Sequence, residues 1–113
     1  MSRFVETTIK LCEVVLDEYM GVEAKVLGYV KQDSEIHITY ENNGDWFPTG
    51  KAIVNIYQYG VYLKEIIENK AHNLGLRAVW IDLNDLSKDE GYYFRHCNEV
   101  YEDLLKYEEI KND

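Results

Sequence analysis

The hydrophobic pattern changes from the period of a helix to that of a strand at Gly21, and this first change restricts the fold more than any other feature of the sequence. Residues 3–20 carry apolar side chains at helical spacing, and Gly21 stands where a left-handed residue commonly ends a helix. Residues 22–31 and 35–41 instead alternate apolar and polar side chains, as half-buried strands do. The three polar residues 32–34 between them are few enough to form a hairpin turn. Because an amphipathic helix and a one-sided sheet bury their apolar faces against each other, the sequence predicts an α+β fold.

Three more elements are predicted after a loop that is rich in turn residues. Residues 51–57 have apolar side chains on both faces, which is typical of a central strand. A helix is predicted over residues 60–74, and the apolar run at residues 76–83 predicts a fourth strand. A capping box over residues 87–90 opens a last helix that reaches about residue 109.

We therefore predict one domain over residues 1–113, with a single four-stranded mixed sheet and helices packed on it. The predicted element order is α-β-β-β-α-β-α. Three consecutive strands favour antiparallel hairpins, and the strand–helix–strand order over residues 51–83 predicts one right-handed parallel crossover.

Composition limits the class of protein. With 46% hydrophobic and 13% aromatic residues, the 113-residue chain is typical of one folded core and not of a disordered chain. Its apolar stretches are too short for a membrane-spanning helix, and the net charge of −9 disfavours binding to nucleic-acid phosphates. The N-terminus lacks a signal-peptide pattern, and Cys12 and Cys97 both lie in helical patterns. These features predict a reduced, cytoplasmic protein.

The reactive residues do not form a recognisable catalytic or metal-binding set. The spacing of His37, His72 and His96 is not that of a zinc site, so we expect no metal ion. His96 is adjacent to Cys97, but a thiol on the apolar stripe of a helix is disfavoured as a thiolate. The sequence therefore leaves the catalytic residues unknown.

Negative charge is concentrated near the end of the sequence, where residues 82–113 hold ten acidic and four basic residues. Acidic faces are usually only solvated, but they also steer association with basic partners. Four acidic residues, Asp82, Asp85, Asp89 and Glu90, stand where the fourth strand ends and the last helix begins. They either form a site at the carboxyl end of the strand, or simply end the strand and begin the helix. The acidic candidates for partner binding are Asp85, Asp89, Glu99, Glu102 and Asp103.

Aromatic residues are the second group of candidates. Ten tyrosines are many for this length, and tyrosine is enriched at protein interfaces because its ring is apolar while its hydroxyl is polar. Trp46 and Phe47 stand in the turn-rich loop, where they form either a lid on the sheet or an exposed anchor. The aromatic candidates for partner binding are Trp46, Phe47, Tyr59 and Tyr62.

Several short motifs follow one another over residues 27–94. They are Leu27-Gly28-Tyr29-Val30, Gly60-Val-Tyr-Leu63, Ile67, Ala71, Leu74-Gly75, Val79-Trp-Ile-Asp82 and Gly91-Tyr92-Tyr93-Phe94. Together they resemble, in part, the acyl-CoA-binding segment of GNAT-type acetyltransferases. The family's phosphate loop is similar to Gln/Arg-x-x-Gly-x-Gly, and here Asn55 takes the first place, Gln58 replaces the first glycine and Gly60 remains. The resemblance implies binding of acetyl-CoA, with Gly60 among the residues that hold it.

The sequence leaves two functions open. The first is a small acidic interaction protein that binds a basic protein partner, which includes nucleic-acid-binding proteins. Such domains are typical of inhibitors and of immunity or anti-defence proteins of phages and mobile elements. In that case we expect no cofactor, no direct contact with nucleic acid and no membrane. The alternative is a compact GNAT-like acetyltransferase that uses acetyl-CoA, or a degenerate relative.

Overall fold

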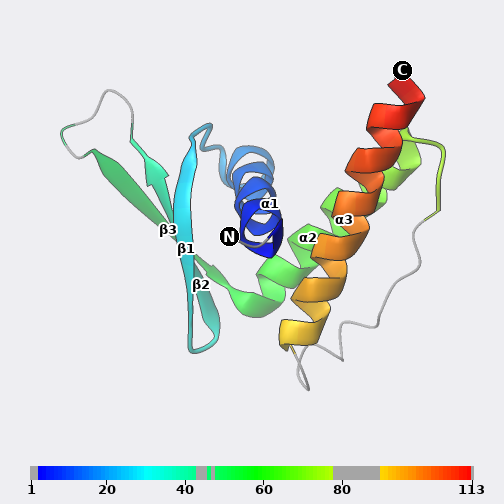
Figure 1. Cartoon of the computed structure of the whole chain (residues 1–113). Coiled ribbons are helices and arrows are strands. Elements are labelled where there is room, and N and C mark those ends of the chain that lie inside the picture. The colour runs from blue at the N-terminus through cyan, green and yellow to red at the C-terminus, as the bar shows by residue number, and fades with distance from the viewer. Residues whose placement is uncertain (1–2, 43–45, 47, 78–89, 113) are drawn as a thin grey trace.

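A computed structural model describes residues 3–42, 46, 48–77 and 90–112 of the chain. The described residues form three helices and three strands, and their arrangement is shown in Figure 1. In chain order they are α1 (Arg3–Met20), β1 (Val26–Gln32), β2 (Glu35–Glu41), β3 (Thr49–Asn55), α2 (Ile56–Asn73) and α3 (Glu90–Asn112). The predictions of a helix over residues 3–20 and of a strand over residues 35–41 are confirmed.

The predicted four-stranded mixed sheet is wrong. The described residues form a three-stranded sheet in the order β1-β2-β3, and both strand pairs are antiparallel. The first hairpin closes at the turn predicted for residues 32–34, where Asp33 takes a positive φ of 55°. After β3, the described elements are two helices, so the predicted order α-β-β-β-α-β-α is corrected to α-β-β-β-α-α for this part of the chain.

The boundary between β3 and α2 explains part of this difference. The side-chain oxygen of Asn55 accepts hydrogen bonds from the backbone N–H groups of Tyr57 (2.9 Å) and Gln58 (3.4 Å), so Asn55 caps the helix. The helix therefore begins at Ile56, four residues before the predicted start. Ile56 and Tyr59 are buried on the face of a helix and do not belong to a strand.

The fourth strand predicted over residues 76–83 falls mostly on residues that the structure does not describe. Leu76 and Arg77 are exposed and lie outside the sheet, and the rest of that segment is outside the described residues. The 18 residues of α2 extend about 27 Å, which takes the end of the helix away from β3. There Gly75 adopts a φ of 74°, and the N–H of Leu76 returns to the carbonyl of Ala71 at 2.8 Å.

Without a fourth strand beside it, β3 is an edge strand of the described sheet and not the predicted central one. Its Ala52 and Val54 are buried, whereas Ile53 is 51% exposed on the other face. The pairing of β1 differs from a simple alternation as well. A bulge between Val26 and Gly28 shifts the register, so Val26 is buried while Val30, predicted on the same face, is 61% exposed.

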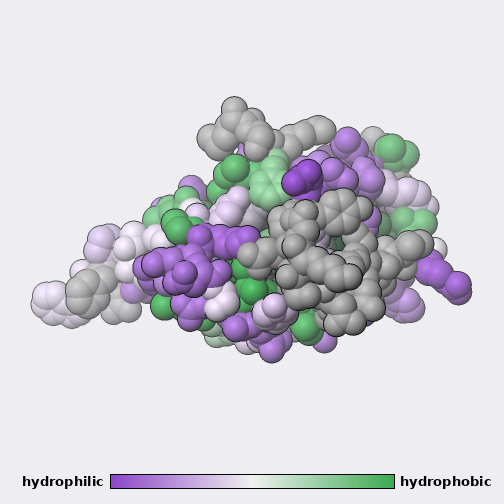
Figure 2. Space-filling view, turned by 90° about the horizontal axis from the view of Figure 1, so that it is seen from below, coloured by the Kyte–Doolittle hydropathy of each residue, from purple (hydrophilic) through white to green (hydrophobic). Residues whose placement is uncertain are grey.

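One hydrophobic core joins buried residues of all six elements. Helices α1 and α2 cover one face of the sheet, and α3 packs against both of them on the side away from the strands (Figure 1). Seen from the end that carries the β1–β2 turn, the hydrophobic residues show as separate areas among hydrophilic ones (Figure 2). Among the described helices, none is long and apolar enough to cross a membrane.

Candidate protein-binding face

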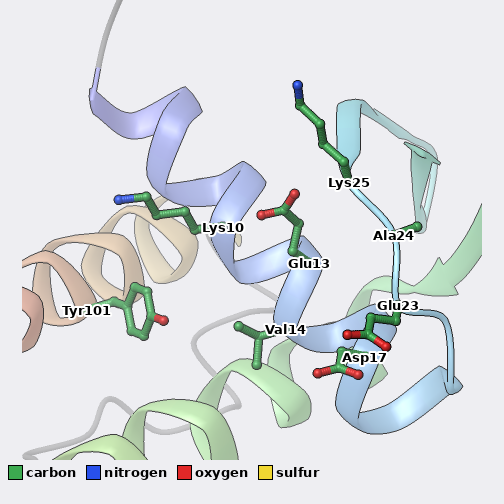
Figure 3. A pocket seen from close by; sticks show the side chains of 8 residues that line it. All are labelled: Lys10, Glu13, Val14, Asp17, Glu23, Ala24, Lys25 and Tyr101. Carbon is green, nitrogen blue, oxygen red and sulfur yellow. The ribbon is translucent and has the colours of Figure 1, made fainter. Parts of the chain in front are cut away.

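An open groove of about 540 Å³ lies between α1, the connection from α1 to β1, and α3 (Figure 3). Three of its lining residues carry carboxylates, Glu13 and Asp17 on successive turns of α1 and Glu23 on the connection. The carboxylates of Asp17 and Glu23 point toward each other in Figure 3. Lys10 and Lys25 also line the groove, so its carboxylates outnumber its ammonium groups.

The local fold explains why these side chains meet. Glu13 and Asp17 are four residues apart on a helix and therefore share one face, opposite the buried stripe of α1. Gly21, with a φ of 67°, turns the chain back after α1, and the N–H of Val22 bonds to the carbonyl of Leu16 at 2.8 Å. This turn returns Glu23 to the side of α1 that carries Asp17.

One carboxylate of the groove also has a structural role. An oxygen of Glu13 accepts a hydrogen bond of 2.9 Å from the backbone N–H of Val26, where β1 begins. Tyr101 forms an uncharged wall from α3, since burial raises the pKa of its phenol. The two other carboxylates of the groove, those of Asp17 and Glu23, belong to exposed residues and remain open to a partner.

A second groove, of about 240 Å³, adjoins the first along the contact between α1 and α3. It is lined by three further carboxylates, those of Glu6, Glu102 and Glu109, and by two ammonium groups. Lys10 lines both grooves. The hydroxyl of Thr7 donates to a carboxylate oxygen of Glu102 at 2.7 Å, which ties the two helices together.

The two grooves form one surface, which we call the acidic face. Its six carboxylates outnumber its three ammonium groups, so it carries an excess of negative charge. The carboxylates belong to Glu6, Glu13, Asp17, Glu23, Glu102 and Glu109, and the ammonium groups belong to Lys10, Lys25 and Lys106.

Of the acidic residues that the sequence singled out, Glu102 lies on the acidic face. Glu99 and Asp103 are exposed on the neighbouring surface of α3. Asp85 and Asp89 fall outside the described residues. Sequence reasoning missed Glu13, Asp17 and Glu23. The signal for Glu13 and Asp17 was the polar side of the first helix, whereas Glu23 lies on the connection after it. Only the packing of α1, this connection and α3 shows that the three side chains line one groove.

The aromatic candidates are divided between the surface and the core. Trp46 is 96% exposed, as an anchor would be and a lid would not, and Phe47 lies outside the described residues. Tyr62 is half-buried and stacks on Tyr19 with 4.2 Å between ring centroids. Tyr59 is only 2% exposed, so it cannot contact a partner in this structure.

The surroundings of Tyr59 show what it does in the core. Its hydroxyl lies 3.5 Å from the sulfur of Cys12, and its ring meets Phe94 edge to face. Burial raises the pKa of Cys12 and of Cys97 to about 12, so both thiols stay protonated at neutral pH. Neither thiol is placed to act as a nucleophile, and both are free and buried as predicted.

Gly60, the residue implied in acyl-CoA binding, lies inside α2 and is buried. Its carbonyl accepts a hydrogen bond from the hydroxyl of Tyr93 at 3.2 Å. At the start of the helix, Asn55 already occupies two of the amides that a pyrophosphate would need. The geometry around Gly60 therefore gives no support to an acetyl-CoA site.

In the part of the chain that the structure describes, no group of three or more His, Cys, Asp or Glu side chains could hold a metal ion. Comparisons of the chain with protein-family models, with curated proteins and with solved structures find no match. The acidic face is thus the feature on which a functional proposal depends.

Proposed function

We propose that this chain is a protein-binding module that binds a basic protein partner through its acidic face. The observation that carries the proposal is the excess of carboxylates around two adjoining grooves. Four of the six, those of Glu6, Asp17, Glu23 and Glu109, belong to exposed residues, so they remain available to a partner. A module of this kind acts by covering the basic surface of its partner, as inhibitors and immunity proteins do.

The charge acts mainly on how fast the partner associates. Coulomb attraction between solvent-exposed charges extends about 8 Å at physiological salt, so the acidic face guides a partner over the last part of its approach. The exposed Glu99 and Asp103 on α3 add to the same negative field. The indole of Trp46, which is exposed on the loop between β2 and β3, offers a second point of contact.

A capture experiment with matched variants tests the proposal. The immobilised chain is exposed to an extract of the cells that produce it, in parallel with D17K/E23K and with a control, E35K/E68K. Both double variants change the net charge equally, but only the first alters the acidic face. We expect the wild type and the control to retain the same basic protein, and D17K/E23K to lose it. Equal retention by all three, or retention of no basic protein, would refute the proposal.

A further inference from the structure

A cavity of about 140 Å³ lies beneath the inner face of the sheet, near the starts of α1 and α3. Its floor contains the buried side chains of Ile36, Tyr59 and Leu63. Phe4 of α1 and Phe94 of α3 are less buried and line its mouth. Every described element except β3 contributes to the lining, so the cavity belongs to the fold and not to one loop.

A space of this size is uncommon inside a protein core. Protein interiors are packed about as densely as organic crystals, and few voids in them are larger than a water molecule. The side chains that border a void lose the contacts that neighbouring atoms would supply. A small molecule that fills the space restores those contacts and removes its own apolar surface from water.

The polar side chains of the lining are engaged within the protein. The side-chain amide of Asn98 donates to the carbonyl of Phe4 at 3.1 Å and to the hydroxyl oxygen of Thr8 at 2.6 Å. The hydroxyl of Thr8 donates to the same carbonyl at 2.7 Å. Lys31, the one charged residue of the described lining, already has an interaction partner in the protein. Because burial of a charge or a polar group needs a compensating partner, this lining favours an uncharged, apolar occupant.

The volume and the aromatic walls restrict that occupant further. An apolar cavity of about 150 Å³ holds a benzene molecule, so about 140 Å³ fits one six-membered ring and not two fused rings. Four lining residues carry aromatic rings, and aromatic rings pack well edge to face. Tyr59 and Phe94 already pack in this way, with 5.4 Å between ring centroids.

We propose that this cavity binds a small, uncharged molecule with a single six-membered ring and at most a short alkyl substituent. Apolar contacts with the aromatic and aliphatic side chains of the lining hold the ring. The site is separate from the acidic face, since the two share no described lining residue. It stands whether or not the chain binds a basic protein.

The experiment uses four probes that differ in size or charge: toluene, cyclohexane, naphthalene and benzylamine. Each is titrated into the protein while methyl NMR signals of Ile36, Leu63 and Thr8 are followed, with Val22 and Val30 as methyl groups outside the cavity. We expect toluene and cyclohexane to shift the signals of the cavity until they saturate. The larger naphthalene and the cationic benzylamine should bind at least about tenfold more weakly.

Substitutions that change the volume of the cavity locate the site. I36F adds a ring to the floor, whereas I53F makes the same replacement at an exposed position on the other face of the sheet. We expect I36F to weaken toluene at least about tenfold and I53F to leave it unchanged. L63A enlarges the cavity instead, and it should bind naphthalene at least about tenfold more tightly than the wild type does.

Melting curves of the three variants show which of them keep the fold, and the titration of the wild type needs none of them. Absence of saturable cavity shifts with toluene and cyclohexane would overturn the proposal. Equal binding of toluene and naphthalene by the wild type, or equal binding of toluene by a folded I36F and the wild type, would overturn it as well.

Discussion

Replacement of Asn98 by alanine tests how firmly α3 is held to the start of α1. The side chain is buried, and its amide makes two hydrogen bonds, to the carbonyl of Phe4 and to the hydroxyl oxygen of Thr8. Loss of two such bonds costs about 2 kcal/mol, and the space left by the amide adds about 1 kcal/mol. The free energy of unfolding should fall by about 3 kcal/mol, which for a chain of this size lowers the melting temperature by roughly 12 °C.

Urea unfolding followed by circular dichroism measures this change, with E99A as the control. Glu99 is the next residue of α3 and is exposed, so its replacement should change stability by less than about 0.5 kcal/mol. A double-mutant cycle of N98A with T8V should show a coupling energy of about 1 kcal/mol, because the two side chains share a hydrogen bond. A change below about 0.5 kcal/mol in N98A, or full additivity in the cycle, would refute the assigned role of Asn98.

Four further predictions concern the two buried thiols, the sheet and acetyl-CoA. A thiol reagent should react slowly with Cys12 and Cys97 in the native protein and reach both after unfolding, and fast native reaction would contradict their burial. The pKa values of both thiols, about 12, lie above that of a thiol in the unfolded chain. The stability that the protonated thiols contribute is therefore complete below pH 9 and is lost as the pH rises toward 12. Melting curves measured across this pH range would show the loss. G50A should destabilise the protein by about 1–3 kcal/mol, because the new methyl would meet the ring of Tyr40 at 2.5 Å, whereas G28A meets nothing within 4 Å and should be tolerated. Acetyl-CoA at millimolar concentration should leave the melting temperature unchanged, and an increase would restore the acetyltransferase alternative.

The elements with a regular spacing of apolar residues were predictable from the sequence. The first helix and the strand at residues 35–41 have long, regular patterns, and the structure contains both within those bounds. The β1–β2 turn was likewise marked by its short polar segment. For the core, the sequence predicts the apolar stripe of each element but not which other element that stripe packs against.

Three features of the fold depend on interactions that the spacing of apolar residues does not reveal. A bulge next to Gly28 reversed the faces of β1, and no rule of alternation reveals an inserted residue. Because the side chain of Asn55 caps a helix, the apolar residues after it belong to that helix and not to a strand. Tyr59 is buried on the same helix. The apolar run after Gly75 was interpreted as a strand, although the end of α2 lies away from the sheet. The candidate site was missed for a related reason, since its carboxylates face one another only after α1, its connection and α3 are packed.

The association rate of the captured basic partner, measured by stopped flow as a function of salt, tests the central proposal most directly. Three acidic residues of α3 are reversed together in E99K/E102K/D103K, and E35K/E68K serves as the control. If the acidic face and the adjoining surface of α3 guide the partner, the triple variant should associate at least about tenfold more slowly than the wild type at low salt. Raising the salt concentration should slow the wild type toward the variant, because screening removes the same attraction. An association rate that neither the reversal nor the salt changes would contradict the proposed role of this surface.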